Sequence, residues 1–391
     1  MTASPALHVE TPEQLIGNAR ALGPKLAAAA DEIDEARQLP IHVVDAIRES
    51  GAFRMSMPRA WGGCQADPLT QNRVIEEISA ASGSAGWCVM IASANAYFNT
   101  FLDQGAAREM YPDPNIVTAA AFAPPGRATK APGGYRVSGR WPFGSGITHS
   151  KWVVGATILM EGDEPVRGDS GVPLQLHAIA PIEEVEVLDT WRTGGLRGSG
   201  SNDFAFNDLF IPAEHTFDIF RGKSQRPGPL WALNSLFLAN HPGVPLGIGR
   251  GALEEFARII KPKTNKFGGA PPREQPTIQI SYANATALVE SSRGFVYAAL
   301  GSLWDTLVAG EEPTIEQRAK LRLSITYAHD ACARAVVELY HAAGSATVYT
   351  PNTLDRHFRD IHTACQHVVA ASNIYAAAGK ALLTDVLPPL W

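Results

Sequence analysis

The sequence predicts an α+β fold that is mostly helical, and three observations lead to this class. At about 100 to 200 residues per domain, its 391 residues correspond to two or three structural units. Apolar residues recur at helical spacing in the first and last thirds, whereas the middle third holds short alternating or β-branched segments. We therefore expect an N-terminal helical domain over residues 1–118, a central β-barrel over 119–225 and a C-terminal four-helix bundle over 226–391.

The helices of the first third are predicted from their end signals. Thr11-Pro12-Glu13 supplies a cap, a proline for the first helical position and an early acid. Gly51 accepts the left-handed conformation that ends a helix, and residues 58–63 are too rich in Pro and Gly to continue one. The expected helices cover 15–36, 41–50, 69–81 and 85–102.

The middle and last thirds differ in their period. Four strands are expected, over 135–141, 152–160, 174–181 and 203–210. Four long helices follow, over 251–260, 276–309, 314–343 and 353–383. Because strands and helices do not alternate, the dinucleotide-binding α/β fold is excluded. The glycines of 247–252 superficially resemble a nucleotide-binding loop, but without a βαβ unit they favour close helix packing instead.

The composition excludes several classes of protein. Hydrophobic residues make up 45% of the chain and charged residues 18%, which is typical of a folded globular protein. The net charge is −6 with no basic stripe, so nucleic acid is not an expected partner. The N-terminal segment lacks the features of a secretory signal, and no apolar run reaches the roughly 20 residues that span a bilayer. We expect a cytoplasmic protein without membrane contact.

No metal-binding pattern is visible either. The cysteines are Cys64, Cys88, Cys332 and Cys365, and no two form a C-x-x-C pair. His357, His362 and His367 are five residues apart, a step that turns about 140° around a helix, so they cannot share one face as ligands. We expect reduced thiols and no metal.

Three groups of motifs resemble the acyl-CoA dehydrogenase superfamily, and together they cover nearly the whole chain. ESGAF at 49–53 and PRAWGG at 58–63 are similar to its helix, turn and P-x-x-x-G-G segment. GRWPFGSG at 139–146 resembles the strand and turn that line its flavin, and DTWRTGGLRGSGS at 189–201 resembles a turn of its flavin-dependent monooxygenase branch. Gly344-Ser345 and DRHFRDIHTACQH at 355–367 resemble its carboxy-terminal region.

The resemblance implies that these motifs bind reduced FAD or FMN. Glycines let backbone N–H groups approach an anion, and Arg197, Ser199 and Ser201 supply donors; an ordinary β-turn is the alternative. Ser145 would hydrogen-bond the N5 edge of the flavin. The expected cofactor residues are Trp141, Phe143, Ser145, Gly146, Trp191, Arg197, Gly198, Ser199, Ser201, Arg293, Gly344 and Ser345. If buried, Arg293 needs an anionic partner, either a flavin phosphate or a carboxylate of a neighbouring subunit in the implied homotetramer.

The catalytic base of the dehydrogenases is missing from its usual place. Their E-G-T turn is absent, and the position of its Glu falls near Val368, which cannot accept a proton. In the monooxygenase branch a His in the place of His367 lies near the flavin. Some dehydrogenases carry their base on another helix of the bundle, and this alternative stays open because Glu254 and Glu255 are present.

The resemblance therefore implies a monooxygenase in which dioxygen adds to reduced flavin as a C4a-hydroperoxide. His367 would donate to or exchange a proton with that peroxide, with Ser145 and Asn95 as the other catalytic residues. Asn95 stands where phenol hydroxylases carry a His, and Asn is no base, which favours an electron-rich, indole-like substrate over a simple phenol. Pocket candidates, on weaker grounds, are Asn95, Tyr97, Phe98, Trp231, Asn234 and Phe237.

Three functions remain open from the sequence. The first is an aromatic or heteroaromatic oxygenase that uses O2 and receives reduced flavin from a separate NAD(P)H:flavin reductase, with N- or S-oxygenation as a variant. The second is an acyl-CoA dehydrogenase or oxidase with a relocated base. The third is a flavin-binding or scaffold relative without turnover.

Overall fold

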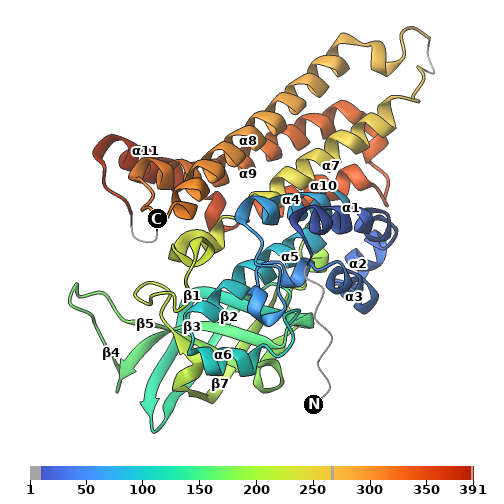
Figure 1. The fold of residues 1–391 in the computed structure, drawn as a ribbon. Helices are drawn as coiled ribbons and strands as arrows, with labels where there is room; N and C mark the ends of the chain where they lie inside the picture. The colour runs from blue at the N-terminus through green and yellow to red at the C-terminus, as the bar shows by residue number, and fades with distance from the viewer. Residues whose placement is uncertain (1–9, 266–267, 389–390) are drawn as a thin grey trace.

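The computed structural model describes residues 10–265, 268–388 and 391, in which helices precede and follow a central sheet (Figure 1). The helices are α1 (Pro12–Ala28), α2 (Ala30–Ala36), α3 (Ile41–Glu49), α4 (Pro68–Ala81), α5 (Gly83–Ala96), α6 (Gln104–Met110), α7 (Gly243–Ile260), α8 (Pro276–Val308), α9 (Ile315–Ala343), α10 (Thr353–Ala364) and α11 (Asn373–Thr384). The strands are β1 (Thr118–Ala131), β2 (Gly134–Gly144), β3 (Trp152–Glu161), β4 (Glu164–Pro165), β5 (Gln175–Pro181), β6 (Glu186–Leu188), β7 (Asn202–Pro212) and β8 (Thr216–Phe217). The predicted order of helices, sheet and helices is confirmed.

The N-terminal helices begin where the cap signals predict, but two of them are shorter than expected. Thr11 and Gln14 form a reciprocal capping box at the start of α1. The single helix expected over 15–36 is wrong, because it divides at Ala29 into α1 and α2. The helix expected over 85–102 ends as an α-helix at Ala96 and continues only as a 3-10 turn over Tyr97–Thr100.

The central sheet is mixed and has the strand order β6-β7-β2-β1-β3-β5-β8, with β4 paired to β3. β1 and β3 are parallel, whereas the other pairs are antiparallel. Within the described chain no pairing joins β6 to β8, so the structure shows a mixed sheet and does not show closure of the predicted β-barrel. The Ala-rich sequence of β1 has low strand propensity, which is why this central strand was not predicted.

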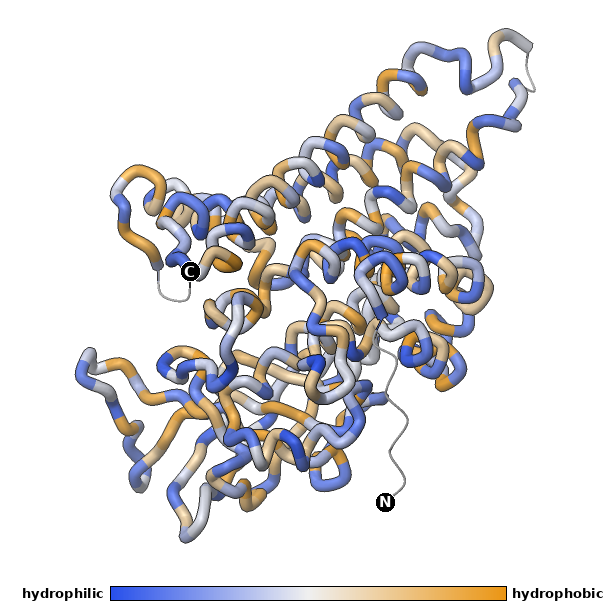
Figure 2. The backbone as a smooth tube through the Cα atoms, viewed as in Figure 1, coloured by the Kyte–Doolittle hydropathy of each residue, from blue (hydrophilic) through white to orange (hydrophobic). Residues whose placement is uncertain are grey.

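The C-terminal helices pack lengthwise, and Figure 2 shows hydrophobic and hydrophilic positions interspersed along them. The expected helix over 353–383 is wrong, because α10 ends at Ala364 and α11 begins only at Asn373. His367 lies within this break: its backbone is extended, and its side chain caps the 3-10 turn Val368–Ala370. Close packing of the glycines in α7 is confirmed, since a Cβ on Gly247 would lie 2.5 Å from the Glu76 carbonyl oxygen of α4.

In the part of the chain that the structure describes, no helix is both long and apolar enough to cross a membrane. Over the same residues, no group of three or more His, Cys, Asp or Glu side chains is arranged to hold a metal ion.

Candidate active site

A chain of buried hydroxyl groups joins two of the predicted flavin motifs. Ser145, just after β2, lies 2.8 Å from Ser201, and Ser201 lies 2.7 Å from Ser199, oxygen to oxygen. The indole N–H of Trp87 on α5 donates to Ser145 Oγ at 3.0 Å. Because a hydroxyl has one donor and two acceptor positions, Trp87 leaves Ser145 one of each to share between Ser201 and a ligand.

The turn that carries Ser145 has an unusual backbone. Phe143 has a positive φ of 66°, which is rare for a residue with a side chain, and Gly146 follows with φ 74°. This turn leaves the Phe143 ring 65% exposed, with its edge against Trp191 at 6.4 Å between centroids. Strained backbone of this kind clusters at functional sites.

Trp87 connects the hydroxyl chain to His367. The two rings meet edge to face with centroids 5.5 Å apart, and His367 also lies 5.0 Å from the ring of His241. The residue after His367 is Val368, whose side chain is 71% exposed. The structure therefore brings the predicted residues Ser145 and His367, far apart in the sequence, into contact with one tryptophan.

His367 is a neutral hydrogen-bond donor rather than an acid at neutral pH. Burial, assisted by His329 and the charge of Arg322, lowers its pKa to about 4. Its Nδ1 accepts the Val369 N–H at 3.4 Å, which places the ring proton on Nε2. Of the two expected roles of His367, donation of a hydrogen bond and exchange of a proton, this neutral ring favours donation from Nε2.

Three further residues beside His367 were not predicted from the sequence. Burial lowers the pKa of His329 to about 4 and that of His241 well below its usual value. Arg322 and His329 lie on one face of α9 with Thr326, whose hydroxyl donates to the Val369 carbonyl oxygen at 2.7 Å. No sequence motif marks these residues. The i, i+4, i+7 spacing of Arg322, Thr326 and His329 on α9 is the signal that could have grouped those three, whereas nothing in the sequence connects His241 to them.

Most of the hydrogen-bond donors predicted in the glycine-rich loop over 189–201 already bond to other groups of the protein. A Cβ on Gly198 would lie 2.0 Å from the Ile33 side chain, so this glycine lets the loop pack against α2. Arg197 Nε donates to the Asp34 carbonyl oxygen at 3.0 Å, and the Leu196 N–H donates to the Asp360 carboxyl at 2.6 Å. Burial raises the pKa of Asp360 to about 7. Anion contact by the loop backbone stays a prediction.

Two other predicted cofactor residues fill structural roles. Trp141 is fully buried and stacks on Phe204 at 5.3 Å, with its indole N–H bonded to the Ala156 carbonyl oxygen. Arg293 pairs with Glu76 of its own chain at 2.9 Å, so its anionic partner here comes from neither a flavin nor another subunit.

Gly344 and Ser345 are not brought to this site within one chain. They follow the C-terminal end of α9, fifteen residues beyond His329, which corresponds to about 22 Å along a helix.

The predicted substrate residues gather in an aromatic core cluster. The ring centroids of Tyr97 and Trp231 are 5.5 Å apart, and those of Phe98 and Phe237 are 5.7 Å apart. The amide of Asn95 donates to the Thr118 carbonyl oxygen at 2.7 Å, whereas Asn234 donates to two loop carbonyls. The same core cluster contains Leu321, Ile325 and Val369, so it adjoins the face of α9 that carries Arg322.

The acids considered as a relocated base point elsewhere. Glu254 is 68% exposed, and Glu255 is bonded to Arg258 of the same helix at 2.6 Å. Among the described residues, no carboxylate contributes to the pKa of His367 or of His241.

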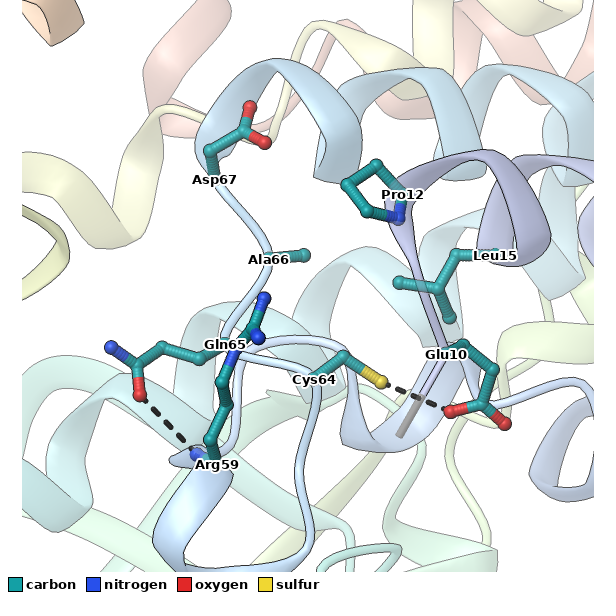
Figure 3. A pocket seen from close by; sticks show the side chains of 8 residues that line it. All are labelled: Glu10, Pro12, Leu15, Arg59, Cys64, Gln65, Ala66 and Asp67. Atoms are coloured by element: carbon teal, nitrogen blue, oxygen red, sulfur yellow. Dashed lines mark hydrogen bonds between the residues drawn. The ribbon is translucent and has the colours of Figure 1, made fainter. Parts of the chain in front are cut away.

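Two cavities elsewhere on the molecule do not involve these residues. The first, of about 200 Å³, is shown in Figure 3, where the Cys64 thiol of its lining donates to the Glu10 carboxylate at 3.3 Å. It is smaller than the roughly 300 to 1,000 Å³ of typical ligand pockets. The second, of about 340 Å³, lies between α8, α9 and α10 and is lined by Leu288 and His362.

The chemical character of the residues around Ser145 suits a flavin ring. Phe143 and Val368 expose apolar surface that a planar ring would cover, and Ser145 and His367 Nε2 supply polar groups beside it. A flavin ring requires this combination of apolar faces with a few donors and acceptors at its edge.

Comparison with known proteins gives two matches to family models. Residues 10–108 match the model described as acyl-CoA dehydrogenase, N-terminal domain. Residues 240–372 match the model described as acyl-CoA dehydrogenase, C-terminal domain.

Individual relatives cover nearly the whole chain. An indole-3-acetate monooxygenase of Acinetobacter baumannii is 30% identical over 90% of this chain and 89% of its own length. The flavin-dependent monooxygenase oxygenase subunit HsaA of Rhodococcus jostii is 27% identical over 89% and 92%. Among solved structures, XiaF from Streptomyces in complex with FADH2 and glycerol superposes with a TM-score of 0.88 at 23% identity, over 97% of both chains.

Proposed function

Because this chain belongs to the two-component flavin-dependent monooxygenase branch of the acyl-CoA dehydrogenase fold, we propose that it oxygenates a small aromatic or heteroaromatic compound at the Ser145–His367 site. It is an oxygenase component, which implies a separate flavin reductase. The observation that carries the proposal is the contact of Trp87 with both Ser145 and His367. The indole-3-acetate monooxygenases among the relatives favour an indole-like substrate.

A bound reduced flavin supplies the activation of dioxygen and its transfer to the substrate. The protein's residues hold and shield that chemistry. Ser145 would hold the N5 edge of the flavin through its free hydroxyl positions, and the neutral imidazole of His367 would donate a hydrogen bond from Nε2 without delivering a full positive charge. The exposed Phe143 and Val368 would lie against the flavin and exclude water.

We further propose that the enzyme is a homotetramer with flavin near subunit contacts. Exposed apolar residues near the C-terminus would be covered by such contacts: Val348, Tyr349, Leu382, Leu383 and Val386. Gly344 and Ser345 follow the C-terminal end of α9, far from His329, the residue of α9 that lies beside His367. In the tetramer they would therefore contact the flavin of a neighbouring copy.

Anaerobic mixing separates the oxygenase from a dehydrogenase. We expect the protein to bind reduced FAD or FMN, and mixing this complex with oxygen to give an oxygenated flavin that persists at least about tenfold longer than in free solution, because the site excludes water. The measurement is stopped-flow absorbance. Bleaching of bound oxidised flavin by an acyl-CoA, without a persistent oxygenated species, would instead establish the dehydrogenase.

A further inference from the structure

Arg322 is a buried arginine, and two nitrogens of its guanidinium form no hydrogen bond with the residues that the structure describes. Only 9% of the residue is exposed, and its Nε and Nη1 atoms are fully buried without a hydrogen bond. Arg226 and Arg250 also have one such nitrogen, but each hydrogen-bonds elsewhere through its guanidinium. A buried charge normally has a partner, because leaving it unpaired costs several kcal/mol.

Among the described residues, no carboxylate offsets the buried charge of Arg322. Burial lowers the pKa of Arg322 to about 10, and no carboxylate counteracts this effect. His241, His329 and His367 face the same region and are neutral at pH 7, since burial depresses the pKa of each. Among the residues that the structure describes, Arg322 is thus the charged member of the group that it forms with these three histidines. An anion would neutralise its charge.

The position of Arg322 connects two parts of the site. One helical turn further along α9, Thr326 bonds the segment that holds His367. Leu321 and Ile325, on either side of Arg322, pack into the aromatic cluster of Tyr97 and Trp231. The guanidinium also lies 5.4 Å from the Trp391 ring centroid, a cation–π contact that leaves its N–H groups available.

We propose that the substrate carries a carboxylate, and that Arg322 binds this carboxylate while the substrate's aromatic ring lies against the adjoining aromatic cluster. This inference rests on the proposed function, because it takes the occupant to be the substrate of that site. Arginine suits the role because its planar, permanently charged donors match a carboxylate. The result is a preference for aromatic acids over uncharged analogues of equal shape.

Binding without oxygen tests this preference. Indole-3-acetate, phenylacetate and benzoate are titrated calorimetrically into the anaerobic protein with reduced flavin, each beside its own amide. A hydrogen bond to a charged group contributes roughly 1.5–3 kcal/mol, so wild type should bind at least one acid about 10- to 100-fold more tightly than its amide. In R322Q that ratio should fall below about threefold, whereas R322K, which keeps the charge, should retain part of it.

The control removes a charge from the same helix. Arg334 is 62% exposed on α9, so R334Q should leave the ratio unchanged. The urea midpoint of R322Q should equal or exceed that of wild type, because an unpaired buried charge destabilises the fold. A wild type that binds no acid more tightly than its amide, or an R322Q protein that keeps the ratio, overturns the proposal.

Two further arms separate the explanations. Reduced FMN and reduced riboflavin differ by a phosphate, so loss of the FMN preference in R322Q would assign Arg322 to the flavin phosphate and overturn the carboxylate. Failure of the proposed function looks different: wild type would bind the acids selectively but would not prolong the life of an oxygenated flavin. Acid selectivity that disappears in R322Q shows that Arg322 binds the carboxylate, and the lifetime of the oxygenated flavin decides separately whether that site is an oxygenase site.

Discussion

Replacing His367 with alanine is expected to shorten the lifetime of the oxygenated flavin by about tenfold or more, while reduced flavin still binds within about threefold of wild type. The reason is that Nε2–H is a partly buried donor whose ring is held by the bond from the Val369 N–H to Nδ1, and positioned donors contribute strongly where charge develops. Stopped-flow absorbance gives the lifetime, and anaerobic titration gives the affinity. H362A, which changes a partly exposed histidine of α10, is the control and should behave as wild type.

The pH profile adds a second readout to the same prediction. Because burial lowers the pKa of His367 to about 4, the imidazole stays neutral from pH 5.5 to 8. The wild-type lifetime should therefore show no inflection that depends on His367 in this range. An inflection near pH 6.5 that disappears in H367A would contradict the neutral-donor role, as would an unchanged lifetime in H367A.

Gly195→Ala is expected to lower the free energy of unfolding by about 3 kcal/mol, at the upper end of the usual overpacking cost. A Cβ there would lie 2.0 Å from the Arg359 carbonyl oxygen of α10, and a backbone atom cannot move aside as a flexible side chain can. Urea unfolding gives the change. Because this loop also carries Ser199 and Ser201, we expect weaker binding of reduced flavin as well.

The neighbouring glycine provides the matched control. A Cβ on Gly194 meets no atom within 4 Å, so G194A should change the stability by less than about 1 kcal/mol. Equal destabilisation of both variants would show that loop entropy, and not contact with α10, determines the effect.

The sequence predicted most of the architecture because the physical signals there are local. The capping box at Thr11 and the alternating residues of 135–141 depend on near neighbours in the chain, and both elements are present. The end of α10 could not be found in this way. No Gly or Pro marks it: the helix ends at Ala364 with Cys365 as its C-cap, and His367 then caps a separate 3-10 turn.

The site was only partly predictable for the same reason. The motif resemblance identified Ser145 and His367, and membership of the family is confirmed. Trp87, which connects the two, looks in sequence like any core tryptophan. Arg322 stands out only when its surroundings are known, because a lack of partners is a property of the folded chain.

The glycine-rich loop shows where composition is ambiguous. The sequence predicts that its glycines make room for an anion, which stays a prediction, and the structure shows that Gly195 and Gly198 make room for α10 and α2. Both requirements select glycine, and the sequence alone does not distinguish between them.

A crystal structure of the anaerobic protein with reduced flavin tests the central claim most directly. The account predicts density for the isoalloxazine ring against Phe143 and Val368, with its N5 about 3 Å from Ser145 Oγ and with His367 Nε2 directed toward the ring. A ring bound away from Ser145 and His367, or a carboxylate facing the ring in place of the imidazole, would contradict it.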